Sequence, residues 1–148
     1  MAQAILLPLL ERGDFKPEQI FGVVGKKTSI QHAREQLPSG VHVFSSSDPG
    51  SAQAWEAPIQ LLAIKPQQLE EVTHKFDQLE TVATNTSPLL ISLLAGVKLT
   101  RLMQFFPTYS CVRAVPNTPA LVGAGLTGLS WGDRITSEQK LLVEKLFK

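Results

Sequence analysis

Two polar residues, Asn117 and Thr118, stand between two prolines, Pro116 and Pro119. Because proline fixes φ and removes a backbone N–H donor, this loop is preorganised and can position a reacting group. Four glycines follow and would permit a tight return of the chain or close packing against a cofactor. The stretch from Val112 to Gly132 therefore looks like neither helix nor ordinary strand, and a surface loop rich in Pro and Gly is the alternative.

Two lysines and two hydroxyl residues, Lys26 to Ser29, directly follow the apolar run that ends at Val24 and the single Gly25. An acidic residue at such a strand end would bind the ribose 2′-hydroxyl of NAD, and none is present here. Positive charge and hydroxyl donors instead suit the 2′-phosphate of NADP. The alternative is a solvated basic turn in which Thr28 or Ser29 caps the next helix.

Further candidates follow two other apolar runs. A residue before proline is pushed towards extended geometry, so Ala63–Lys65 should leave its strand in a fixed direction before Pro66 starts a helix. Lys65 is then a candidate neighbour of a phosphate or a ribose. Gly96 has no side chain, which would let its backbone approach a flat ring or a pyrophosphate. Ordinary turns are the alternative for both segments.

Other chemistry finds little support in the sequence. The single cysteine, Cys111, excludes an internal disulfide, fits a reducing cytoplasm and reads as a small core residue. The three histidines are scattered, so no metal-ligand spacing is present. No G-x-S-x-G elbow and no Walker A loop occurs.

The candidate residues follow a regular alternation of elements. Runs of strand length and apolar character are Ile20–Val24, Val41–Phe44, Ile59–Ile64, Leu89–Ala95 and Cys111–Val115. Most are continuously apolar, as expected of parallel strands covered on both faces. Helical periodicity occurs at the start of the chain up to Gly13, in Pro66–Leu79, in Val97–Phe106 and from the TSEQ capping sequence at Thr136 onward. This rhythm predicts an α/β fold with a doubly wound, Rossmann-like, mostly parallel sheet.

Length and composition are consistent with that fold. The 148 residues form one domain by size, with 43% hydrophobic and 18% charged residues. A net charge of +1 gives no electrostatic reason to expect nucleic acid or an anionic membrane as a partner. No apolar run approaches the roughly 20 residues of a membrane-spanning helix. We therefore expect a cytoplasmic protein that acts on a small molecule.

Three segments, LLAIKP, ISLLAGV and VPNTPALVGAGLTGL, in this order and spacing closely resemble pyrroline-5-carboxylate reductases. The run from Pro116 to Gly125 is the most specific of them. The opening MAQAILLPLLERG is similar to the end of that family's G-x-G-x-M-A phosphate turn and the helix after it. The resemblance covers essentially the whole chain. It implies that NADP(H), or NAD(H), delivers a hydride to the C=N bond of 1-pyrroline-5-carboxylate, giving L-proline.

The resemblance also assigns roles by position. Met1 and Ala2 would end the phosphate turn, and Lys26 and Lys27 would lie where the adenosine 2′-phosphate is read. Residues after two of the strands would line the cofactor: Ala63, Ile64, Lys65, Pro66, Leu94, Ala95 and Gly96. Asn117, itself a cofactor contact, and Thr118 would lie close to the nicotinamide as the catalytic residues. Their rigid loop would hold the nicotinamide and the flat imine face to face.

Parts of the family pattern have no counterpart in the sequence. These are the first strand with the glycines of the phosphate turn, and a helical C-terminal domain that in this family supplies dimerisation and most substrate contacts. We therefore expect residues 1–148 to form a partial NAD(P)-binding domain, incomplete at its N-terminus and inactive alone. Around Ser45–Trp55 the chain is slightly longer than the family's usual form, which leaves a cofactor contact near Ser47 or Asp48 open.

The leading hypothesis is thus the nucleotide-binding part of a pyrroline-5-carboxylate reductase. Two alternatives stay open at this point. One is a non-catalytic remnant that binds nucleotide weakly or only self-associates. The other is a different reductase of the β-hydroxyacid-dehydrogenase type with the same nucleotide fold.

Overall fold

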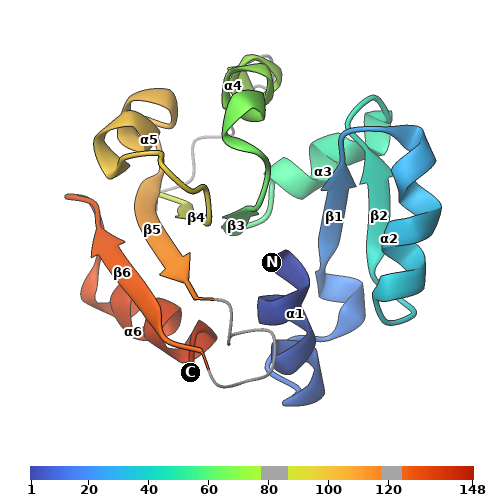
Figure 1. Cartoon of the computed structure of the whole chain (residues 1–148), viewed down its shortest axis with the longest axis horizontal. Coiled ribbons are helices and arrows are strands. Elements are labelled where there is room, and N and C mark those ends of the chain that lie inside the picture. The colour runs from blue at the N-terminus through green and yellow to red at the C-terminus, as the bar shows by residue number, and fades with distance from the viewer. Residues whose placement is uncertain (78–86, 118–124) are drawn as a thin grey trace. The chain divides into compact units, whose positions relative to one another are not determined.

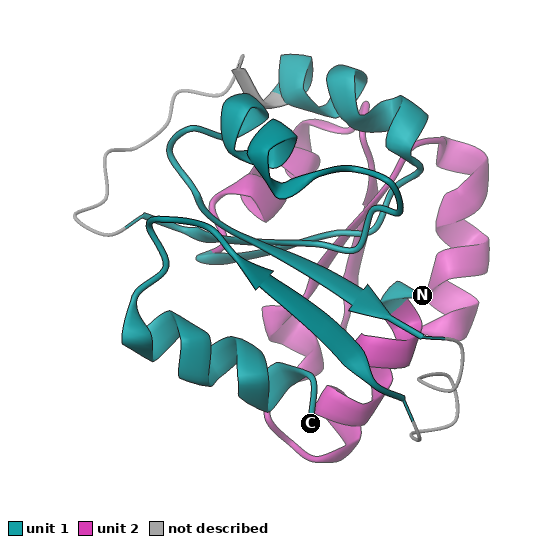
Figure 2. Cartoon of the chain, turned by 60° about the vertical axis from the view of Figure 1, so that its left-hand side comes forward, with its two compact units in different colours: residues 1–2, 58–148 teal, residues 3–57 magenta. Residues whose placement is uncertain are grey.

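The computed structural model describes residues 1–77, 87–117 and 125–148. They form two compact units, shown in different colours in Figure 2. Unit 2 comprises Gln3–Ala57, and unit 1 comprises Met1–Ala2 with Pro58–Lys148. Each unit has its own sheet, so each is described by itself.

Unit 2 is built on a two-stranded parallel sheet of β1 (Phe21–Val24) and β2 (His42–Ser45), visible in Figure 1. Val24 lies opposite Ser45, so both strands end at the same edge. Three α-helices and three 3₁₀ turns complete the unit: α1 (Ala2–Glu11, all but its first residue), η1 (Pro17–Gln19), η2 (Lys27–Ser29), α2 (Ile30–Gln36), η3 (Pro49–Ser51) and α3 (Ala52–Trp55).

Helix α1 confirms the helix expected at the start of the chain, with Pro8 inside it. Its C-terminus has the geometry that glycine favours. Gly13 adopts φ +72°, its N–H donates to the Leu10 carbonyl at 3.1 Å, and the Asp14 N–H donates to the Leu9 carbonyl at 3.0 Å. Left-handed backbone at this position costs glycine little, which is why Gly13 ends the helix.

Unit 1 contains a four-stranded sheet in the order β3-β4-β5-β6. The first three strands are parallel, and β6 is antiparallel to β5. The elements of this unit, in chain order, are β3 (Ile59–Leu62), η4 (Pro66–Gln68), α4 (Leu69–Asp77), β4 (Leu89–Ser92), α5 (Leu99–Phe105), β5 (Ser110–Pro116), β6 (Thr127–Trp131) and α6 (Ser137–Leu146). Figure 2 shows α6 on one side of this sheet and α5 on the other.

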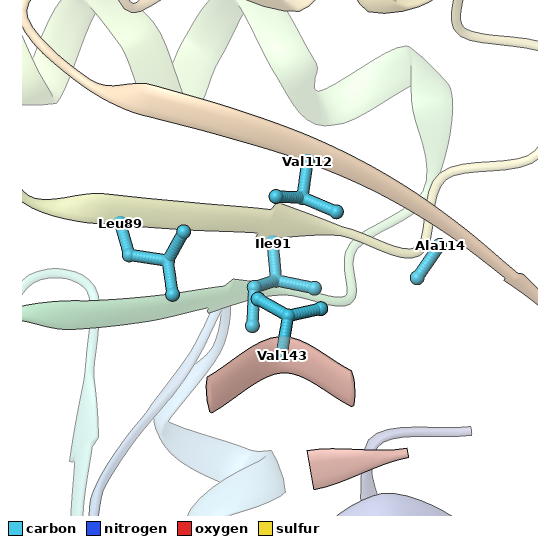
Figure 3. Packing of buried hydrophobic residues seen from close by; sticks show 5 residues of the cluster. All are labelled: Leu89, Ile91, Val112, Ala114 and Val143. Atoms are coloured by element: carbon cyan, nitrogen blue, oxygen red, sulfur yellow. The ribbon is translucent and has the colours of Figure 1, made fainter. Parts of the chain in front are cut away.

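One core layer of unit 1 lies between the sheet and α6. Leu89 and Ile91 of β4, Val112 and Ala114 of β5, and Val143 of α6 are each at most 2% exposed and pack as one cluster (Figure 3). Alternate residues of a strand point to the same face, so the same pattern sends Leu90, Cys111 and Arg113 to the other face. Burial on both faces explains why these strands read as continuous apolar runs.

The structure confirms all five strands expected from the sequence, each within three residues at either end. It also confirms the helices after Pro66, before Pro107 and at the C-terminus, although residues 78 and 79 of the first lie outside the described residues. At α6 the expected capping box is present, because the Gln139 N–H donates to Thr136 Oγ1 and the Thr136 N–H donates to Gln139 Oε1, both at 3.1 Å. The predicted α/β class with mostly parallel strands is therefore correct.

One expectation was wrong. The stretch from Val112 to Gly132 was expected to be neither helix nor ordinary strand, yet Thr127–Trp131 form β6. The reason is that exposure alternates along this strand between partly buried and exposed residues, so it carries no continuous apolar run. Gly128 and Ser130 take the more exposed positions, which hid the apolar alternation of Leu129 and Trp131.

Gly132 directly after β6 should not tolerate a side chain. A Cβ built on Gly132 would lie 2.8 Å from the Cys111 carbonyl oxygen, which is backbone and cannot rotate away. We expect Gly132→Ala to lower the free energy of unfolding by about 1–3 kcal/mol, the usual cost of overpacking. Urea unfolding followed by circular dichroism measures this.

The matched control is Gly128→Ala within β6, where nothing lies within 4 Å of the added Cβ. This change should shift the free energy of unfolding by no more than about 0.5 kcal/mol. Equal effects of the two substitutions would show that backbone crowding at Gly132 does not limit the fold.

Candidate functional site

The carboxyl ends of β3, β4 and β5 lie at one edge of the sheet of unit 1, because the three strands are parallel. In register, Leu62 of β3 lies opposite Ser92 of β4, and Ser92 lies opposite Arg113 of β5. The segments that follow these strands are 63–66, 93–96 and 117. Open α/β sheets bind their ligands at this edge.

The segment after β3 leaves the sheet in an extended conformation. Lys65 has φ −73° and ψ 142°, and its backbone N–H donates to Gln68 Oε1 at 3.1 Å before Pro66 begins η4. Ala63, Lys65 and Pro66 are exposed, and Ile64 is partly buried. The extended conformation expected before Pro66 is therefore present, and Lys65 is exposed to solvent.

The segment after β4 turns sharply at Gly96. The Leu93 N–H donates to the Leu62 carbonyl at 2.9 Å, and the Leu94 N–H donates to Ser92 Oγ at 3.3 Å. Leu94 is buried, so its side chain serves the core and its contribution to a ligand would come from the backbone. Ala95 and Gly96 are exposed. Gly96 adopts φ +72° with open space where a Cβ would be, as a close backbone approach to a ligand requires.

Asn117 closes the hairpin between β5 and β6. Its backbone N–H donates to the Leu126 carbonyl at 3.2 Å, and its side-chain Oδ1 accepts the Leu126 N–H at 2.9 Å. The side chain thus takes the place of the carbonyl that would continue the ladder beyond Pro116 and Thr127. Asn117 is exposed, and Thr118 lies outside the described residues.

A basic turn, Gly25 to Ser29, follows β1 in unit 2 and is exposed from Gly25 to Thr28. Within the described part of the chain, neither Lys26 nor Lys27 forms an ion pair. Ser29 occupies the N-cap position of α2, but its side chain makes no capping hydrogen bond. The capping role considered for Thr28 or Ser29 is therefore not found, and this turn offers cationic and hydroxyl donors to solvent.

The polar loop after β2 lies beside this basic turn. The Ser46 N–H donates to the Val24 carbonyl at 2.8 Å, and the Ser46 hydroxyl donates to the Gly25 carbonyl at 3.2 Å. Asp48 Oδ2 accepts the Ser45 N–H at 2.8 Å. The backbone N–H of Ser45, then its hydroxyl, and more weakly the charge of Lys27 hold the pKa of Asp48 below its usual value. Asp48 is therefore ionised at neutral pH.

The two residues expected to end a phosphate turn are at the start of the chain. Ala2 is the first residue of α1, and Met1 precedes it with 51% of its surface exposed.

Comparison with known proteins decides the family. No protein-family model matches the chain. A pyrroline-5-carboxylate reductase of Synechocystis is 36% identical over 148 residues, which cover 99% of this chain and 51% of the relative. One of Haemophilus influenzae is 37% identical over 139 residues, with 93% and 47% covered. The chain belongs to the pyrroline-5-carboxylate reductase family.

Solved structures agree with this family. The pyrroline-5-carboxylate reductase of Coxiella burnetii superposes with a TM-score of 0.78 at 31% identity, covering 99% of this chain and 51% of that protein. A Plasmodium falciparum pyrroline carboxylate reductase with NADP bound has a TM-score of 0.69 at 21% identity, covering 97% and 49%, and it shows the shared Rossmann-type fold. The chain spans about half the length of the relatives it matches.

Two features of this chain were not predicted from the sequence. A hollow of about 480 Å³ begins at Gly96 and continues along α5, where it is lined by Lys98, Thr100, Arg101, Gln104 and Phe105. Arg101 pairs with Glu70 at 3.3 Å and lies over the Phe105 ring. The signal available was the run of polar residues on one side of the predicted helix, which alone does not distinguish a site from a solvated face.

The second missed feature is Arg113. Its Nε is buried and has no hydrogen-bond partner among the described residues, and Ser92 and Ser130 are its neighbours in register. A charged residue inside the apolar run CVRAV was the signal. Arg113 thus offers an unused donor on the strand that leads to Asn117.

The structure also restricts other chemistry. Among the residues that it describes, no group of His, Cys, Asp and Glu could hold a metal ion. His42, exposed on β2, stacks on Phe21 with ring centroids 4.9 Å apart. In the same described part, no helix has the length and apolar character needed to cross a bilayer.

Cys111 should be chemically inert in the folded protein. It is 1% exposed, and burial raises the pKa of its thiol to about 11, against a weaker opposite effect of Arg134. Because the thiolate is the reactive form, a pKa two units above normal reduces it about 100-fold at pH 8. We expect native protein to react with an aromatic disulfide reagent at least about 100-fold more slowly than protein in urea, measured by absorbance. Equal rates would contradict burial of the thiol.

Proposed function

We propose that the chain is the NADP(H)-binding part of an enzyme that reduces 1-pyrroline-5-carboxylate to L-proline. The observation that carries this proposal is the agreement of 99% of the chain with a relative of that name at 36% identity. The same fold holds NADP in the Plasmodium falciparum protein. No observation favours a non-catalytic remnant or a reductase of another type.

Each unit presents residues that suit one part of a dinucleotide. The nicotinamide half would lie at the carboxyl edge of unit 1, against Ala63 to Pro66 and the exposed backbone of Ala95 and Gly96. The adenosine 2′-phosphate would be bound by Lys26 and Lys27, whose ammonium groups have no ion pair among the described residues. Met1 and Ala2 would lie near the pyrophosphate. NADPH would supply a hydride to the imine carbon, and NADH would serve less well.

The role we assign to Asn117 is to fix the loop against which the nicotinamide and the imine meet. Hydride transfer requires the two rings face to face, so its rate depends on positioning. The two hydrogen bonds between Asn117 and Leu126 hold the loop at its base, and Thr118 would complete the polar surface. Half of each relative's length has no match here, and we propose that this half supplies substrate contacts and homo-oligomerisation. A cytoplasmic location is also proposed, supported by the unpaired Cys111.

The function is tested with a chimera in which residues 1–148 replace the matching half of the Synechocystis relative. We expect NADPH-dependent reduction of 1-pyrroline-5-carboxylate, followed by absorbance at the nicotinamide band. Residues 1–148 alone should show no turnover. A chimera that folds and binds NADPH but does not reduce the imine would contradict the proposal.

In this chimera, Asn117→Ala should lower kcat about 10- to 100-fold, because a small displacement of reacting groups has an effect of that size. The dissociation constant for NADPH should stay nearly unchanged, since the phosphate contacts lie elsewhere. Asn117→Asp is the control, because it keeps the Oδ1 acceptor for the Leu126 N–H. A large rise in the NADPH dissociation constant with unchanged kcat would assign the loop a different role.

The two lysines should determine the preference for NADPH. Hydrogen bonds to charged groups contribute about 1.5–3 kcal/mol, so losing them costs at least about tenfold in binding. We expect Lys26→Ala combined with Lys27→Ala to lower kcat/KM for NADPH by this factor or more and to leave kcat/KM for NADH unchanged. Comparable kcat/KM for both cofactors before and after the change would exclude a 2′-phosphate site at this turn.

A further inference from the structure

Three consecutive serines lead from β2 to the turn that precedes α3, and the middle one, Ser46, fastens this serine loop to the end of β1. Two hydrogen bonds from Ser46 reach the Val24 and Gly25 carbonyls, directly before Lys26 and Lys27. The Ser45 and Ser47 hydroxyls lie 2.9 Å apart. The serine loop and the basic turn therefore form one continuous polar surface within unit 2.

Asp48 holds this loop from its far end. Its Oδ2 accepts the Ser45 N–H at 2.8 Å, and its backbone N–H donates to the Ser45 carbonyl at 3.0 Å. Its own carbonyl accepts the Ser51 hydroxyl at 2.7 Å and the Ser51 N–H at 3.0 Å. Four hydrogen bonds thus fix one aspartate between the end of β2 and the start of α3.

The same side chain places a negative charge close enough to Lys27 for the two charges to interact through space. Lys27 stabilises the ionised carboxyl of Asp48 through space, yet the two groups are not among the ion pairs within 4.0 Å in the described structure. Lys27 therefore keeps its donors free for another anion. A phosphate bound to Lys26 and Lys27 would be repelled by the Asp48 carboxylate.

We propose that Asp48 is a positioning and specificity-determining residue of the adenosine site, which both holds the serine loop in place and limits the preference for a 2′-phosphate. This inference rests on the proposed NADP(H) function and extends it. The hydrogen bonds to Ser45 need only an acceptor oxygen, whereas the discrimination against phosphate needs the negative charge. The two roles are therefore separable by substitution.

Binding of small nucleotides to the 148-residue chain tests the proposal without any catalytic readout. The probes are adenosine 2′,5′-bisphosphate and 5′-AMP, which differ only in the 2′-phosphate, and calorimetry measures both. Asp48→Asn keeps an acceptor for the Ser45 N–H and removes the charge. We expect it to tighten bisphosphate binding about fivefold, the size of a carboxylate–phosphate repulsion across solvent. Affinity for 5′-AMP should not change, and the fivefold gain should shrink in high salt.

Two further variants separate structure from charge. Asp48→Ala removes the acceptor as well, so it should weaken binding of both nucleotides through the loosened serine loop. Glu35→Gln removes one negative charge from the far end of α2, about 9 Å along the helix axis from Ser29, and should change neither affinity. Thermal unfolding of each variant confirms that it is folded before binding is compared.

The outcomes distinguish the inference from the function on which it rests. If the unmodified chain prefers the bisphosphate and Asp48→Asn leaves that preference unchanged, or alters both affinities equally, the inference is overturned and the proposed function stands. If the unmodified chain binds neither nucleotide, or binds both equally, no 2′-phosphate site exists at the two lysines and the inference is overturned, whereas the proposed reductase function is decided separately by the chimera.

Discussion

The parallel pairing of β3, β4 and β5 is the constraint on which the candidate site of unit 1 depends. Parallel strands run to the same edge, so residues 63, 93 and 114 arrive together although they are far apart in sequence, and β5 continues from there to Asn117. The pairing requires burial on both faces, which α6 and α5 provide on opposite sides of the sheet. No single side chain creates this edge. The edge follows from the direction of the strands, and the polar residues there lie near one another because their strands run to the same edge.

Much of this arrangement could be predicted from the sequence, because buried parallel strands leave an unmistakable pattern. Leu89–Ala95 and Cys111–Val115 are apolar apart from Ser92 and Arg113, and Pro66, Gly13 and Thr136 carry local signals for helix ends. Strand β6 escaped prediction because one of its faces is exposed, so Gly128 and Ser130 are tolerated there. The sequence pattern therefore predicted the strands that are buried in the core and missed the strand with an exposed face.

The candidate site was less predictable than the fold. Residue type and position after a strand were enough to single out Lys26, Lys27 and Gly96, since exposure and backbone geometry follow from the turn. The hydrogen bonds of Asn117 and Asp48 were not accessible, because each depends on which backbone groups a loop brings near. Buried donors such as Arg113 Nε are recognised only when their surroundings are known. Hydrogen bonds and burial that depend on more than one segment of the chain can be recognised only in the three-dimensional structure.

Because the Asn117 side chain closes the β5–β6 hairpin, the connection between Asn117 and Leu126 can differ in length among relatives. The pair Asn117 and Leu126 ends the ladder, so the register of β6 against β5 is set on the strand side of that pair. Residues inserted between the two would leave the register intact. Loop-closure entropy grows slowly, by about 0.6 kcal/mol for each doubling of length. The fold therefore tolerates a longer or shorter connection at small cost in stability, provided that an acceptor oxygen remains at position 117.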